Sequence, residues 1–163
     1  DDDHQYFGAA LMQIAEDPHF TAINAVKLNG STAHNAFRIN DNIGVYLKYA
    51  SRPVSAYSEY RFTFSTEHLA LLEALDAATG RAFVALVCIK GREICCLPYE
   101  SVQELVARRK SAKGAPEDQY VIPVTLGEGK SFRAYINVPG EKGRVLGKQL
   151  VIARNDFPRA LFA

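Results

Sequence analysis

The sequence predicts an α+β fold, a mixed α/β arrangement with an antiparallel-rich central sheet, helices packed on it and a β-rich C-terminal tail. Some segments carry apolar residues at spacings of three and four, as helices do, and others alternate apolar and polar residues, as strands do. Hydrophobic residues make up 48% of the 163 residues and charged residues 23%, so the chain can bury a core of ordinary size.

The first third of the chain is expected to contain a helix, a hairpin and a strand. Apolar residues of segment 6–16 share one helical face, and Asp17-Pro18 ends this helix because the residue before proline avoids helical conformations. Asn29-Gly30 favours a type I′ turn, which predicts a hairpin of residues 21–28 and 31–40. Alternation from Ile43 to Tyr49 predicts a half-buried strand.

Strands and helices then follow one another. Alternation in residues 60–64 predicts another strand, and Ser65 or Thr66 caps a helix that Gly80 ends. The run 82–89 is apolar on both sides and is typical of a central strand, and a short strand follows it. Ser101 and Glu104 fit the capping box of a third helix, with an alternative start directly after Pro98.

We expect a single domain in three parts. Residues 1–110 form the α/β core, residues 111–118 form a loop, and residues 119–163 form a β-rich C-terminal extension packed on the same domain. The loop is predicted from its Ser, Gly and Pro content. The extension contains three strand candidates, which are joined by glycine-rich turns: 120–126, 131–138 and 147–154.

The composition predicts a cytoplasmic protein that has no membrane partner. No apolar run approaches the roughly 18 residues that a membrane span needs. Cys88, Cys95 and Cys96 form an odd set within apolar strands, which is typical of buried thiols in a reducing compartment. They lack the Cys-x₂-Cys spacing of a structural zinc site and the four histidines complete no motif, so we expect no metal and no cofactor.

Lys48 is the first candidate for chemistry. Alternation places it on the same strand face as Asn42 and Tyr46, opposite Val45 and Leu47. A helix, several strands, a helix and a buried strand, with a lysine in the third strand, form an order that resembles the core of the PD-(D/E)XK nuclease superfamily over residues 6–97. An alternative also stays open, in which Lys48 is a solvated side chain on an edge strand.

The resemblance implies catalytic roles for Lys48 and Asp41. In that superfamily two carboxylates hold a divalent metal that activates water, and the second carboxylate lies two residues before the lysine. Asp41 matches the first acid, but Tyr46 occupies the position of the second, and a tyrosine does not replace a carboxylate as a ligand of a hard cation. The resemblance therefore implies a degenerate metal site, and Mg²⁺ is expected only if the protein is an active nuclease.

A cluster of basic residues in the tail is the second candidate. Phe132 and Tyr135 lie among its members, which are Lys130, Arg133, Lys142, Arg144 and Lys148. Basic side chains neutralise phosphates and aromatic side chains stack on bases, so the cluster favours contact with nucleic acid. The alternative is that these charges keep a β-rich tail in solution, because the net charge of the whole chain is only +1.

We therefore expect a nucleic-acid-associated domain, a degenerate nuclease-like module that contacts phosphates. The first alternative is a protein-interaction or assembly module of a larger bacterial complex, or a homo-oligomer. It would expose to another chain either the edge of a sheet or an apolar strip in the tail that consists of Leu150, Val151, Ile152, Phe157, Leu161 and Phe162. The second alternative is an enzyme whose site is assembled from scattered residues.

Overall fold

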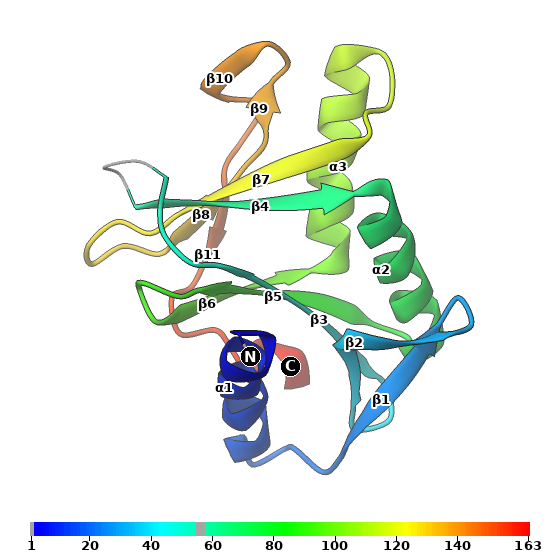
Figure 1. Ribbon diagram of the computed structural model, residues 1–163. Coiled ribbons are helices and arrows are strands. Elements are labelled where there is room, and N and C mark those ends of the chain that lie inside the picture. The colour runs from blue at the N-terminus through cyan, green and yellow to red at the C-terminus, as the bar shows by residue number, and fades with distance from the viewer. Residues whose placement is uncertain (1, 55–57) are drawn as a thin grey trace.

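The computed structural model describes residues 2–54 and 58–163 and confirms the predicted α+β fold (Figure 1). The described residues form three α-helices, a short 3₁₀ helix and three β-sheets. The helices are α1 (Asp2–Glu16), α2 (Thr66–Thr79), α3 (Tyr99–Lys113) and η1 (Arg159–Phe162). No helix in this part of the chain is long and apolar enough to span a membrane.

The larger sheet, sheet A, has the strand order β1-β2-β3-β5-β6. Neighbouring strands are antiparallel except β3 and β5, which are parallel because α2 lies in the connection between them. Asn29 and Gly30 have φ angles of 52° and 84°, as the predicted hairpin turn requires. The strands are β1 (Ile23–Leu28), β2 (Ser31–Ile39), β3 (Ile43–Ala50), β5 (Ala82–Cys88) and β6 (Glu93–Pro98).

The tail joins the first part of the chain in a second antiparallel sheet, sheet B, of order β11-β8-β7-β4. The strand predicted at residues 60–64 therefore leaves the central sheet and pairs with the tail. A small hairpin, β9–β10, projects beyond sheet B (Figure 1). These strands are β4 (Glu59–Ser65), β7 (Gln119–Thr125), β8 (Phe132–Ala134), β9 (Asn137–Val138), β10 (Glu141–Val145) and β11 (Leu150–Ile152).

The predicted loop 111–118 is shorter in the structure. Residues 111–113 continue α3, because Ser, Ala and Lys do not interrupt a helix, and Gly114 ends it with a φ of 79°. β7 then begins at Gln119. The third helix starts directly after Pro98 and has no side-chain cap, so the alternative start is the observed one.

β5, in the interior of sheet A, is buried on both faces. Alternate residues of β5 enter a large core formed with α2, α3 and sheet B, and the others enter a smaller core formed with α1 and the C-terminal segment (Figure 1). Cys88 and Cys95 lie in the large core and Cys96 in the smaller one, and all three are free and buried. Burial is the main reason that the pKa values of these thiols are raised, so they remain protonated.

A glycine in β3 permits the close approach of α2 to sheet A. A Cβ atom on Gly44 would lie 2.7 Å from both Leu75 Cγ and Thr79 Oγ1. We expect Gly44→Ala to lower the free energy of unfolding by about 1–3 kcal/mol, because the helix must shift. Urea denaturation measures this loss. Gly8→Ala is the control, since nothing lies within 4 Å of its Cβ position in α1, and equal stability of both variants would contradict the expectation.

Candidate functional site

Lys48 lies between the two sheets. Its strand, β3, is the third of five in sheet A, so the interpretation of Lys48 as an edge-strand residue is wrong. The side chain is half-buried, and Nζ lies 5.0 Å from the centroid of the Phe64 ring in β4. Nζ also lies 3.3 Å from Nδ1 of His68, in the first turn of α2. Among the described residues no carboxylate forms an ion pair with Lys48.

His68 is held in place by the N-terminus of α2. The Nδ1 atom of His68 accepts a hydrogen bond from the Ser65 backbone N–H at 3.2 Å. The backbone N–H of His68 donates to Ser65 Oγ at 3.1 Å, which completes a capping box. Burial lowers the pKa of His68, and the nearby Lys48 charge lowers it further. A neutral imidazole is consistent with this geometry, because Nδ1 must stay unprotonated to accept hydrogen bonds.

Asp41 and Lys48 lie at opposite ends of β3. Asp41 is exposed in the turn before this strand, and its carbonyl accepts a hydrogen bond from Arg38 at 2.8 Å. From Ile43 to Lys48 alone the strand extends about 16 Å, at about 3.3 Å per residue. Tyr46 is buried, and burial raises its pKa. Within residues 2–54 and 58–163 there is no group of three or more His, Cys, Asp or Glu side chains that could hold a metal.

Three of the five predicted nucleic-acid-binding cations lie outside the hairpin β9–β10 in the chain. Lys130 is exposed in the turn between β7 and β8. Arg133 lies in β8, where Nη1 donates to the carbonyls of Ser131 and Phe132 at 3.3 and 3.4 Å. Lys148 is exposed in the segment that leads to β11.

The other two cations lie together in β10. Lys142 is exposed and forms no ion pair or hydrogen bond with the described residues. Arg144 Nη1 forms an ion pair with Glu141 Oε1 at 2.8 Å. The charge of Arg144 is therefore balanced within the hairpin, and that of Lys142 is not.

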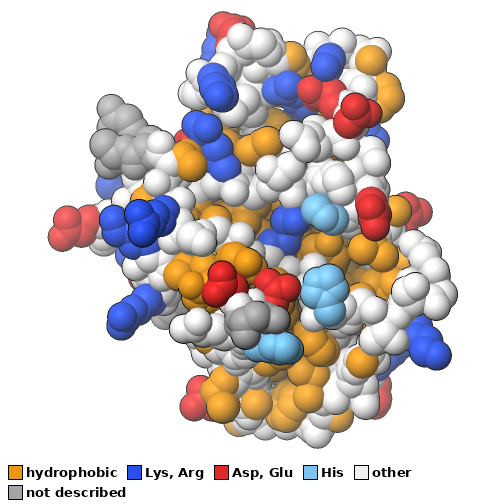
Figure 2. Space-filling view, in the orientation of Figure 1, with side chains coloured by type: hydrophobic (Ala, Val, Ile, Leu, Met, Phe, Trp, Pro, Cys, Tyr) orange, Lys and Arg blue, Asp and Glu red, His pale blue; other side chains and the backbone are white. Residues whose placement is uncertain are grey.

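A hollow of about 610 Å³ lies between the hairpin β9–β10, the C-terminal end of α3 and β7. Three cations from separate segments line it, together with the carboxylates of Glu117 and Glu141: Arg61 of β4, Arg109 of α3 and Lys142 of β10. Figure 2 shows a notch between two projections of the molecule, with Lys and Arg side chains on its sides. We name this feature the cationic hollow. Its apolar lining includes Val121, Ile136 and Val138.

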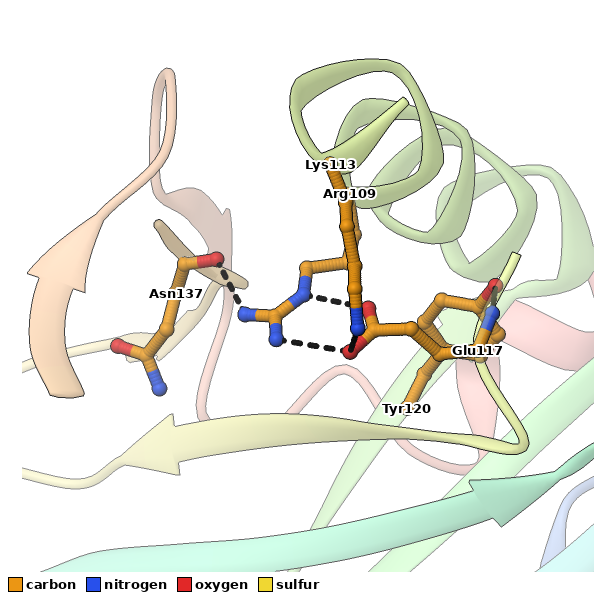
Figure 3. Close-up of polar contacts among 5 residues, drawn as sticks. All are labelled: Arg109, Lys113, Glu117, Tyr120 and Asn137. Carbon is orange, nitrogen blue, oxygen red and sulfur yellow. Dashed lines mark hydrogen bonds and ion pairs between the residues drawn. The ribbon is translucent and has the colours of Figure 1, made fainter. Parts of the chain in front are cut away.

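A network of charged residues holds the two walls of the cationic hollow together (Figure 3). Arg109 forms a bidentate pair with Glu117 at 2.6 and 2.9 Å and donates to the carbonyl of Asn137 in β9 at 3.0 Å. Lys113 binds the same carboxylate at 3.2 Å, and Tyr120 Oη accepts from the Glu117 N–H at 2.8 Å. The hydrogen bond from Arg109 is the main cause that lowers the pKa of Glu117.

Arg61 is positioned by a second network. Its Nε lies 3.1 Å from Oε2 of Glu59, and Oε1 of this carboxylate accepts a short hydrogen bond from the Tyr135 hydroxyl. Burial, and then the Glu59 carboxylate, raise the pKa of Tyr135, so the hydroxyl keeps its proton. The two Nη groups of Arg61 form no ion pair or hydrogen bond with the described residues. They are available to an anion.

Sequence reasoning missed Arg61 as a site residue. Arg109, at the end of the predicted third helix, is one of the basic residues that the sequence suggests as an extension of the basic cluster. The alternation of Tyr60, Phe62 and Phe64 toward the core does place Arg61 on the outer face of its strand. Alternation does not reveal that α3 and β10 lie beside that face.

Comparisons with models of protein families, with curated proteins and with solved structures found no match for this chain.

Burial lowers the pKa of the Lys48 ammonium group to about 8, and this shift predicts a pH-dependent stability. Between about pH 8 and pH 10.5 the unfolded chain binds more protons at this lysine, so its contribution to stability improves as the pH rises. We expect the free energy of unfolding of Lys48→Met, relative to that of the wild type, to be highest at pH 7 and to fall toward about pH 10. Urea denaturation across this range measures the difference.

The exposed Lys27→Met in β1 is the matched control for Lys48→Met. Its difference from the wild type should stay constant over the same pH range. A constant difference for Lys48→Met as well would show that Lys48 titrates as a solvated lysine.

Proposed function

We propose that this domain binds nucleic acid through the cationic hollow and contacts phosphates without strong catalysis of its own. One observation carries the proposal: Arg61 and Lys142 come from distant parts of the chain, line the same hollow, and keep donors that no described residue uses. A guanidinium fork and an ammonium group are the groups that proteins use to bind phosphate.

The local charge around the cationic hollow supports the same function. The net charge of the chain is only +1, but the side chains at this site carry an excess of positive charge. The lining of the hollow holds three cations against two carboxylates: Arg61, Arg109 and Lys142 against Glu117 and Glu141. A concave surface with this excess raises the local concentration of an anionic polymer.

The order of elements in sheet A is also consistent with a nuclease-like module. One helix, three antiparallel strands, a crossover helix and a parallel strand follow one another as α1, β1, β2, β3, α2 and β5. The surplus strand β4 belongs to sheet B. Tyr46 at the position of the second acid, and the distance from Asp41 to Lys48, favour a role in binding over metal-dependent cleavage. The proposed function therefore keeps the resemblance to the PD-(D/E)XK nuclease superfamily. It also includes a cytoplasmic location, which the free cysteines support.

The protein-interaction alternative loses half of the apolar strip that was one of its two predicted surfaces. The structure buries Ile152, Phe157 and Leu161 within the chain, so the expectation that they are exposed is wrong. Ile152 lies in β11 of sheet B and packs into the large core, and Phe157 and Leu161 pack into the smaller core on the other face of sheet A. Val151 is 63% exposed in β11, but one exposed valine does not form an apolar patch.

Binding of a fluorescent oligonucleotide, followed by anisotropy at several salt concentrations, tests the proposal. We expect Lys142→Ala and Arg61→Ala each to weaken binding and to lower the slope of log affinity against log salt by roughly 0.7–0.9, the value for one phosphate contact. Arg144→Ala should have a smaller effect, because Glu141 already balances this charge.

Lys27→Ala is the matched control, since Lys27 is an exposed lysine in β1 of sheet A, outside the cationic hollow. It removes the same charge from the chain and should leave the slope unchanged. The proposal is wrong if the wild type does not bind at low salt, or if Lys142→Ala and Lys27→Ala behave alike.

A further inference from the structure

We propose that the cationic hollow takes single-stranded nucleic acid, with an unstacked base inside against the apolar lining and the flanking phosphates at Arg61 and Lys142. This inference rests on the proposed function, and it names the class of nucleic acid. It is supported by the size of the hollow, by its lining and by the hydrogen bonds and ion pairs within its walls.

The size of the hollow suits one nucleotide unit. Its volume of about 610 Å³ lies within the range of about 300–1,000 Å³ that small-molecule sites occupy. A double helix presents phosphates on its outside and keeps its base faces stacked inside, so it can touch the rim but cannot reach the lining. A single strand exposes its base faces, and each can enter a concave site.

The lining offers apolar and polar contacts at the same place. Val121 and Val138 are half-buried and present apolar surface to the hollow, above the buried Ile136. Asn137 Oδ1 accepts from the Gly143 N–H at 3.0 Å, and its Nδ2 group forms no hydrogen bond with the described residues. Figure 3 shows the Asn137 side chain pointing away from Arg109. This amide is therefore a donor available to a base or a sugar.

The walls of the hollow are organised before a ligand arrives. Arg109 of α3, which Glu117 holds in place, donates a hydrogen bond to the carbonyl of Asn137. Glu59 likewise holds Nε of Arg61. The guanidinium plane of Arg61 can stack on a base while its Nη groups bind a phosphate. A site that is already ordered binds its ligand with a smaller entropic cost.

Four oligonucleotides of one length test the inference with the full chain: an oligothymidine strand, an oligouridine strand, an abasic DNA strand and a DNA duplex. We expect the thymidine strand to bind at least about fivefold more tightly than the abasic strand, because a stacked base contributes affinity that phosphates do not. The duplex should bind more weakly than the thymidine strand at the same salt concentration. Tighter binding of the uridine strand than of the thymidine strand would identify the single-stranded ligand as RNA.

A variant of the lining adds an independent measurement. Val121→Thr keeps a β-branched residue in β7 and introduces a hydroxyl, and it should weaken binding of the thymidine strand while leaving that of the abasic strand unchanged. Far-UV circular dichroism and urea denaturation verify that the variant is folded.

The outcomes separate the inference from the proposed function. If the abasic strand or the duplex binds as tightly as the thymidine strand, and Lys142→Ala still weakens binding, the single-strand inference is overturned and the proposed function stands. If none of the four oligonucleotides binds at low salt, both are overturned.

Discussion

The parallel pairing of β3 with β5 is the constraint on which the rest of the structure depends. Two parallel neighbours need a crossover, and α2 supplies it on one face of sheet A. Gly44 lets this helix lie close to β3, and the capped N-terminus of α2 then brings His68 to Lys48. The face of sheet A that α2 covers becomes the large core, so the other face needs α1 and the C-terminal segment. The burial of the tail residues Phe157 and Leu161 follows from the same requirement.

The second consequence of the crossover is the position of the cationic hollow. The chain reaches α2 through β4, which turns its aromatic residues toward the large core and Arg61 outward. β7 pairs with β4 along its whole length, and α3 precedes β7 by one short loop, so the end of α3 lies beside the C-terminal end of β4. Arg61, farther along β4, lines the same hollow as Arg109. The Arg109–Glu117 pair then fixes the hairpin β9–β10 across from it. Each wall of the hollow is thus attached to a buried strand.

The sequence could predict what depends on neighbours along the chain. Alternation, the Asn29-Gly30 turn and the Ser65 and Gly80 caps gave the helices and most strands, because these signals act over a few residues. It could not predict that Tyr60 pairs with Val124, since pairing between distant segments leaves no local pattern. Treating every strand as a member of one sheet also hid the contact of Lys48 with Phe64, which belongs to sheet B.

The same distinction explains why charge along the chain was an incomplete guide to the candidate site. Cations counted in the tail include Arg144, which an acid three residues away balances, and Arg133, which binds backbone carbonyls. The free donors of the hollow come from Arg61, whose nearest acid holds only Nε, and from Lys142. A cation contributes to binding an anion only with donors that its own chain leaves unused. The number of unused donors in one concave surface, and not the net charge of +1, is therefore the property that the proposed function requires.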